Sequence, residues 1–229
     1  MSGKSHFLPQ TTANKELVDS VPSRARHSIN KRNAITDAAA ALFLKEGYGQ
    51  VSMDRIAQSA CVSKQTVYSH FQSKESLFEA LVTERCDEML SMVPEPVDRA
   101  RPVSDVLDHL GRSFLMLVLA DDAINLYRTV LAESIRFPEL GRAFYNAGPK
   151  RSHSRLASYL KKEAEKGTLA IEDPQVAAEQ FFGMVKGDLY NKGLLGVATT
   201  EDIQAIDLAV ERAVKVFMAA YAVNGSQAI

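Results

Sequence analysis

Three consecutive residues, Lys64, Gln65 and Thr66, carry an ammonium, an amide and a hydroxyl group. A glutamine amide can pair with adenine through two hydrogen bonds, and a threonine methyl group can contact the methyl group of thymine. We therefore predict that Gln65 and Thr66 reach the edges of bases, with Lys64 close beside them. The alternative is a polar helix face that only meets solvent.

Further polar residues nearby are suited to the phosphate backbone, which positions a protein on a duplex without reading its sequence. The hydroxyl of Ser52, at the start of a preceding helix, can meet a phosphate together with the N-terminus of that helix. We expect phosphate contacts from Tyr68, His70 and Lys74 as well, and Ser69 completes the predicted DNA-binding set.

Two short helices joined by a tight turn must position these side chains. Ser52 can cap a first helix whose apolar residues recur three and four positions apart. The pattern breaks at 61–63, and Ser63 can cap a second helix over 64–71. The expected buried residues are Met53, Ile56, Ala57, Ala60, Val67 and Phe71. A short turn followed by a helix with a polar exposed face is typical of a helix-turn-helix that binds DNA.

The same stretch resembles the N-terminal DNA-binding domain of the tetracycline-repressor (TetR) family. The resemblance covers 30–81 and rests on Ala34-Ile35 through Gly47-Tyr48, followed by SMDRIAQSACVSKQTVYSHFQSKESLF. It implies a symmetric dimer that places two reading helices in successive major grooves. One residue departs from the family, which usually has glycine where this chain has Cys61. If that residue has a positive φ, its side chain costs on the order of 1 kcal/mol.

Charge is distributed unevenly along the 229 residues, although the formal net charge is only −1. The window 24–74 holds eight Lys and Arg residues but three acidic ones, so it carries +5 while the rest of the chain carries −6. A basic N-terminal region on an acidic remainder indicates a nucleic-acid contact confined to one end.

The chain has two cysteines, Cys61 and Cys86, without metal-ligand spacing, and no segment suited to be a signal peptide or to cross a membrane. We expect a cytoplasmic protein with free thiols, without a metal or cofactor and without a membrane partner. Oxidation of either thiol could alter DNA binding, so a redox-responsive regulator is the alternative function.

Helical spacing extends over the rest of the chain, and no alternating strand pattern occurs. We predict an all-α protein of about nine to ten helices. We expect three parts: a flexible arm over 1–28, a three-helix helix-turn-helix domain over 29–75, and a helical ligand-binding and dimerisation domain over 76–229. The basic end of the arm either lies along DNA or is solvated. The first helix is expected over 30–46 and ends at Gly47, Ser73 caps a fourth helix, and Gly148-Pro149 is expected to end a short helix.

The stretch 127–196 resembles the C-terminal domain of the AefR-like branch of the same family, which implies a pocket for a small effector and a dimer interface. Flexible Met and aromatic side chains suit an apolar or amphipathic ligand, although such residues also form ordinary cores. The candidate pocket residues are Met89, Met92, Phe114, Met116, Leu126, Tyr127, Val130, Phe144, Tyr145, Phe181 and Phe182. Glu133 and Asn125 are either polar pocket groups or solvated.

Two late helices, one from Asp173-Pro174 and one over 200–223, are the candidates for an intersubunit four-helix bundle. Their predicted interface residues are Met184, Val185, Leu189, Ile206, Val210, Val214, Phe217 and Tyr221. The alternative is that these apolar stripes pack only within one subunit.

Taken together, the residues and the resemblance predict a DNA-binding transcription regulator that is not an enzyme. We expect a homodimeric repressor that binds a palindromic operator in double-stranded DNA and is released by a small-molecule effector, with activation as the less favoured sense. The sequence has no Gly-rich phosphate loop and no G-x-S-x-G motif, and its five histidines are dispersed. A helical interaction module with a vestigial reader remains a further alternative.

Overall fold

The computed structural model describes residues 23–90 and 101–223, and their regular secondary structure is helical apart from one isolated antiparallel bridge between Leu169 and Ala222. The prediction of an all-α protein is confirmed. The described residues divide into two compact units, one formed by 23–81 with 129–143, the other by 82–90, 101–128 and 144–223. This division differs from the single boundary expected near residue 75, because a segment of the second half belongs with the N-terminal helices.

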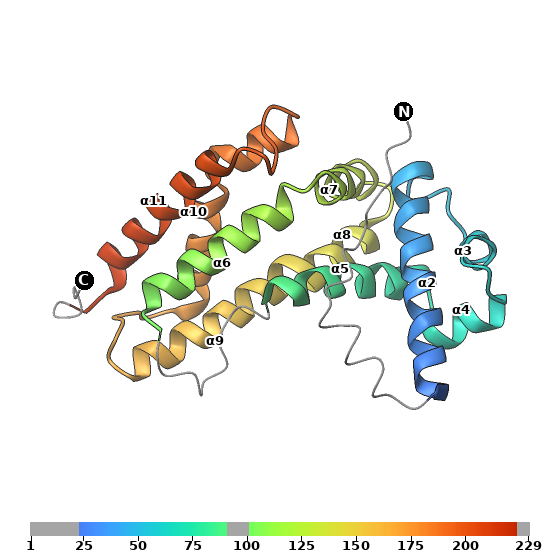
Figure 1. Cartoon of the computed structure of the whole chain (residues 1–229), viewed down its shortest axis with the longest axis horizontal. Helices are drawn as coiled ribbons and strands as arrows, with labels where there is room; N and C mark the ends of the chain where they lie inside the picture. Colours follow the sequence, from blue (N-terminus) through green and yellow to red (C-terminus); the bar gives the residue numbers. More distant parts are fainter. Residues whose placement is uncertain (1–22, 91–100, 224–229) are drawn as a thin grey trace. The chain divides into compact units, whose positions relative to one another are not determined.

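The first unit contains α2 (Ser23–Glu46), α3 (Met53–Ser59), α4 (Lys64–His70) and the first turns of α5 (Lys74–Leu90), with the end of α7 (Asp121–Glu133) and the start of α8 (Pro138–Tyr145). The short helices α3 and α4 pack on each other and on α2 (Figure 1).

Three buried rings form the centre of this unit. The ring centroid of Phe43 lies 5.2 Å from that of Tyr48 and 5.9 Å from that of Phe78, and the last two are 5.7 Å apart. Tilted and edge-on rings at such distances attract one another beyond the burial of their surfaces. They fix α2, the α2–α3 loop and α5 to one another.

Helix α2 begins at Ser23 rather than at Asn30, so the end of the predicted flexible arm is helical. The stretch from Ser23 to Glu46 contains no proline and no glycine, and nothing in it stops a helix from extending towards the N-terminus. The predicted end is confirmed, since Gly47 follows with φ +81° and donates to the carbonyl of Phe43.

The second unit is a helical bundle built on α6 (Val103–Val118), α9 (Arg151–Glu165), α10 (Pro174–Leu194) and α11 (Ile203–Tyr221). Helix α10 packs on α9, α11 and α6, and α11 packs on α6 (Figure 1). A Cβ atom at Gly111 of α6 would lie 2.9 Å from Cγ1 of Val210, so glycine is what allows α6 and α11 to approach closely.

The helices α8 and α9 are joined without a break through a π-helical turn, Asn146–Lys150. The prediction that Gly148-Pro149 ends a helix is therefore wrong. Proline lacks an N–H and its ring collides with the preceding turn of an α-helix, and a wider π turn accommodates it. Ser152 donates a side-chain hydrogen bond to the carbonyl of Gly148 at 3.0 Å, beside the backbone N–H of Arg151.

Helix α10 is interrupted at Gly187, whose backbone angles are φ 40° and ψ −144°. Near its end, α10 is held by Arg128 of α7, which donates from Nη2 to the carbonyl of Leu194 at 2.8 Å and from Nε to the same oxygen at 3.1 Å. The side-chain oxygen of Asn125 accepts a hydrogen bond from Nη1 of the same guanidinium. This amide therefore helps to orient Arg128, which connects α7 to α10.

Candidate nucleic-acid interface

The short helices α3 and α4, with the turn between them, form the helix-turn-helix that we call the reader. Both helices are capped as predicted. The hydroxyl of Ser52 accepts a hydrogen bond from the backbone N–H of Arg55 at 3.2 Å, and that of Ser63 accepts one from Thr66 at 3.1 Å. Each cap satisfies an N–H group that has no partner inside its helix. The starts of α3 and α4 are thus fixed by local sequence.

The turn between them is a Schellman motif with Cys61 at its left-handed position. Cys61 has φ 53°, its N–H donates to the carbonyl of Gln58, and the N–H of Val62 donates to that of Ala57. The conditional expectation of a positive φ is confirmed, so the side chain of Cys61 carries a conformational cost. The thiol is free and exposed.

The two faces of α4 differ in burial as their residue types predict. Val67 and the following Phe71 are 0% and 3% exposed and anchor the helix to its unit. Gln65 and Ser69 are exposed, and Tyr68 is 44% exposed. The opposite face is therefore open to a partner, while Thr66 and His70 are partly buried.

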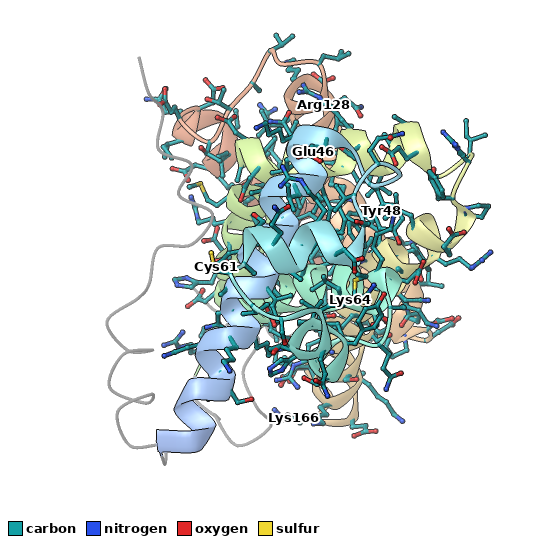
Figure 2. All side chains as sticks on the ribbon, turned by 90° about the vertical axis from the view of Figure 1, so that its right-hand side faces the viewer. Glu46, Tyr48, Cys61, Lys64, Arg128 and Lys166 are labelled. Carbon is teal, nitrogen blue, oxygen red and sulfur yellow. The ribbon has the colours of Figure 1, made fainter. Side chains whose placement is uncertain are left out.

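Several polar groups on this face already have partners within the protein. Thr66 Oγ1 lies 2.8 Å from the hydroxyl of Ser63, and Ser69 donates to the carbonyl of Thr66 at 2.8 Å. Lys64 Nζ lies 2.8 Å from a carboxylate oxygen of Asp54, and both side chains are largely exposed. The hydrogen bond to Asp54 raises the pKa of Lys64. An exposed pair of this kind is weak, so Lys64 can exchange Asp54 for a phosphate or a base. Figure 2 labels Lys64 and Cys61 on the side of the protein that carries α3 and α4.

Lys74 has a role that the sequence did not reveal. Its Nζ donates to the carbonyl oxygens of Tyr48 and Val51 at 2.8 and 3.0 Å, and it lies 4.2 Å from the centroid of the Tyr48 ring. Burial lowers its pKa. An ammonium group has three donors, so Lys74 ties down the α2–α3 loop with two of them. Its contact with a phosphate stays a prediction.

The same loop is held from the other side by residues of the second half of the chain. The N–H of Gly49 donates to Oε2 of Glu133 at 2.6 Å, and the ring of Phe137 lies 5.9 Å from that of Tyr48. A Cβ atom at Gly49 would lie 2.7 Å from Phe137. Glu133 and Phe137 hold the loop formed by residues 47–49. We call these two residues and this loop, taken together, the loop clasp. Glu133 thus contacts the first unit, which contains the reader. In the sequence, the two glycines that flank Tyr48 were the signal that another side chain approaches this loop closely.

The candidate pocket residues are dispersed. Phe114, Leu126, Phe181 and Phe182 are buried and Tyr127 and Phe144 partly buried in the second unit, whereas Val130 is buried in the first. Met116 and Tyr145 are 43% and 52% exposed, because they lie on outward faces of α6 and α8. Met92 lies outside the described residues, as does the side chain of Met89.

The predicted dimer residues separate into two sets. Five of them are between 0% and 9% exposed within one protomer, namely Val185, Ile206, Val210, Val214 and Phe217. The structure places these in the protomer's own core, as the close approach of Val210 to α6 illustrates. Met184, Leu189 and Tyr221 are only partly buried. Their place in a dimer interface stays a prediction.

Within the described ranges 23–90 and 101–223, no group of histidine, cysteine, aspartate and glutamate side chains could hold a metal ion, and no helix is both long and apolar enough to span a membrane.

A helix-turn-helix with an exposed polar second helix, joined to a helical bundle, defines a class of DNA-binding regulators. Residues 35–81 match the N-terminal domain of the bacterial TetR regulatory proteins, and residues 105–223 match the C-terminal domain of the AefR-like transcriptional repressors. The chain belongs to the TetR family of DNA-binding transcriptional regulators.

Two solved structures and one relative found by sequence agree with the assignment to this family. A TetR-family regulator from Mesorhizobium loti MAFF303099 is 31% identical, with a TM-score of 0.72 over 86% of this chain and 98% of its own. The flavonoid-responsive regulator FrrA is 34% identical, with a TM-score of 0.70 over 85% of this chain and 98% of its own. The regulator YvkB of Bacillus subtilis is 27% identical over 170 residues, which are 73% of this chain and 84% of YvkB.

Proposed function

We propose that this protein is a cytoplasmic repressor that binds a palindromic operator as a homodimer and leaves it when a small molecule binds to its helical bundle. The observation that carries the proposal is the asymmetry of α4, which is held by two buried apolar side chains and presents exposed amide, hydroxyl and aromatic groups on its other face. Gln65, Thr66 and Lys64 are the proposed base readers. Ser52 and the remaining residues of the predicted set would hold phosphates.

Two copies are needed because one reader contacts too few base pairs to be selective. The outward faces of α10 and α11 supply the proposed interface. They enclose an apolar groove of about 400 Å³ lined by Gln180, Gly183, Met184, Val216, Phe217, Ala220 and Tyr221. Leu208 and Val216 of α11 are 44% and 56% exposed. A second copy that covers this groove would remove exposed apolar surface from water.

Repression relieved by an effector is supported by the family and by one relative. The C-terminal match is to transcriptional repressors, and FrrA is described as responsive to a flavonoid. We infer a small, largely apolar effector for this chain too, bound in the second unit. An effector shifts the balance between two conformations only by its difference in affinity for them, commonly by about 1–3 kcal/mol.

Two helices each run through parts of both units, the second of which is the proposed site of the effector. Helix α5 begins in the first unit and continues into the second, and α7 begins in the second and ends in the first at Glu133. A movement of α7 would therefore reach the loop clasp, and through it the loop that precedes α3.

Selection of bound duplexes from a random library at two salt concentrations tests this function. We expect two inverted half-sites whose centres lie one helical turn apart, about 34–36 Å, and affinity that falls steeply as salt rises. Binding without sequence preference would favour the vestigial-reader alternative. Treatment of the same protein with peroxide tests the alternative of a thiol-responsive regulator. Among the described residues, no contact of Cys61 favours this alternative, because the turn between α3 and α4 already explains the positive φ of Cys61.

A further inference from the structure

The side chain of Lys186 in α10 is partly buried, and no carboxylate of the described residues pairs with its ammonium group. Its Nζ lies 5.1 Å from the ring centroid of Tyr190 and 5.6 Å from that of Phe114. Within the described part of the chain, no acidic side chain forms an ion pair with it. By contrast, Lys192 on the same helix pairs with Asp188 at 2.9 Å on the surface. Burial lowers the pKa of Lys186, which reflects a cation that lacks a counter-charge.

Aromatic rings extend from this ammonium group in two directions within the second unit. On one side, the ring of Tyr190 lies 5.9 Å from that of Tyr127, which lies 5.5 Å from that of Phe144. On the other side, the ring of Phe114 lies 4.7 Å from that of Phe182. Aromatic side chains at such distances can stack on a planar ring, and the ammonium group of Lys186 offers a positive charge to an anionic group on that ring.

A second polar group without a partner lies at the Phe182 end of this row. The imidazole of His153 in α9 lies 5.5 Å from the ring of Phe182, and its buried Nδ1 has no hydrogen-bond partner among the residues that the structure describes. Burial lowers the pKa of His153, although the charge of Glu179 opposes this. Buried polar atoms normally have a partner, so the Nδ1 atom of His153 is a position where a further hydrogen bond could form, in the same cluster as the ammonium group of Lys186.

We propose that the effector is an aromatic anion, whose charged group is held by Lys186 and whose ring lies against the aromatic side chains of Phe114, Tyr190 and Phe182, with His153 as a second polar contact. This inference rests on the proposed function and adds the chemical class of the ligand. A carboxylate or an ionised phenol would supply the counter-charge that Lys186 lacks. A neutral molecule of the same shape would leave the ammonium unpaired.

The break in α10 gives this site a route to the reader. Gly187 follows Lys186 directly, and its φ of 40° is a backbone conformation that glycine adopts without the penalty of a Cβ atom. The segment beyond the break carries the carbonyl of Leu194, to which Arg128 of α7 is bonded. An anion that draws Lys186 towards itself would move this segment, and Arg128 would pass the movement to α7.

Titration calorimetry with one matched pair of compounds tests the inference without DNA. The probes are naphthalene-2-carboxylate and naphthalene-2-carboxamide, which share a shape but differ in charge. We expect the wild-type protein to bind the carboxylate at least about tenfold more tightly than the amide, as a desolvated charge pair requires. Lys186→Met should abolish this preference while Lys192→Met, at an exposed position of the same helix, keeps it.

Equal affinity for the two probes, absence of carboxylate binding to the wild type, or a preference that survives Lys186→Met would overturn the inference. Circular dichroism and duplex binding of each variant show that the protein is folded and separate the two proposals. A protein that binds its operator but shows no preference for the carboxylate contradicts only the ligand class. A protein that selects no duplex contradicts the proposed function itself.

Discussion

Individual side chains of the reader differ in how far their groups are already engaged within the protein, so some chiefly hold the fold and others are open to DNA. Cys61 and Lys74 belong to the first set, because one occupies the left-handed position of a turn and the other bonds two backbone carbonyls. Gln65 and Tyr68 belong to the second. Substitutions at the two sets should therefore separate stability from recognition.

Replacing Cys61 by glycine should stabilise the protein. Glycine adopts a positive φ without a Cβ clash, and part of the gain is lost because glycine makes the unfolded chain more flexible. We expect the free energy of unfolding to rise by about 0.5–1 kcal/mol, measured by urea denaturation. Cys61→Ala keeps the Cβ atom and should give no such gain; an equal rise in both variants would point to the thiol rather than to the backbone.

Replacing Gln65 by alanine should relax the preference at one base pair in each half-site, at a cost of about 1–3 kcal/mol for the preferred base. Competition binding with operators altered at single positions measures this. Tyr68→Phe is the comparison, since the loss of a phosphate contact should weaken all duplexes alike. Lys74→Ala is unsuited to this purpose because it also removes the bonds to Tyr48 and Val51. Identical effects of the two substitutions on every duplex would contradict the division of roles.

At the scale of elements, contacts distant in the sequence fix the geometry of the reader. The α2–α3 loop is held by Lys74 from the start of α5 and by Glu133 from the end of α7. The helices themselves form where capping residues predict, but the loop depends on a residue 84 positions away.

Replacing Glu133 by alanine should lower the free energy of unfolding by about 1–2 kcal/mol, because the N–H of Gly49 loses its acceptor. The effect should be strongest in hydrogen exchange at Gly49, which NMR can follow residue by residue. Glu133→Gln retains an acceptor oxygen and should keep most of the protection. If both variants exchange at the wild-type rate, Glu133 does not hold the loop.

The first turn of α5 should make stability depend on acid pH. A hydrogen bond from Ser73, followed by a backbone N–H, lowers the pKa of Glu75 below its usual value of 4.5. The folded state therefore prefers the ionised form, so this stabilisation is present above about pH 4.5 and is lost as the pH falls through the lowered pKa. Glu75→Gln should flatten that acid limb, as measured by thermal denaturation between neutral pH and pH 3, and a limb as steep as in the wild type would exclude the role.

At the scale of the whole molecule, the proposed dimer depends on apolar faces that one protomer leaves exposed. Val216→Glu places a charge on the α10–α11 groove and should weaken dimerisation at least about tenfold. Analytical ultracentrifugation over a range of concentrations measures this. Ile135→Glu is a matched control, because Ile135 is 90% exposed but belongs to the other unit. A dimer that tolerates Val216→Glu would place the interface elsewhere.

The sequence predicted those parts of the fold that local signals determine. Ser52, Ser63 and Gly47 marked helix ends correctly, and the family resemblance identified the class of protein. Apolar spacing could not decide which face of α11 is inward, because Ile206 and Val210 lie on one stripe and Leu208 and Val216 on another. The loop clasp was missed because a contact between Gly49 and Glu133 leaves no periodic trace, and Pro149 was interpreted as a break because the π turn that accommodates it has no sequence signature of its own.

Helix α7 has one anchor at Arg128 on the end of α10 and another at Glu133 on the loop clasp. One residue added to or removed from the stretch between them would turn Glu133 by about 100° around the helix axis and shift it by about 1.5 Å. Evolution can therefore vary the surface of this stretch but not its length. Homologues that retain both anchoring side chains should align there without gaps, whatever effector they recognise.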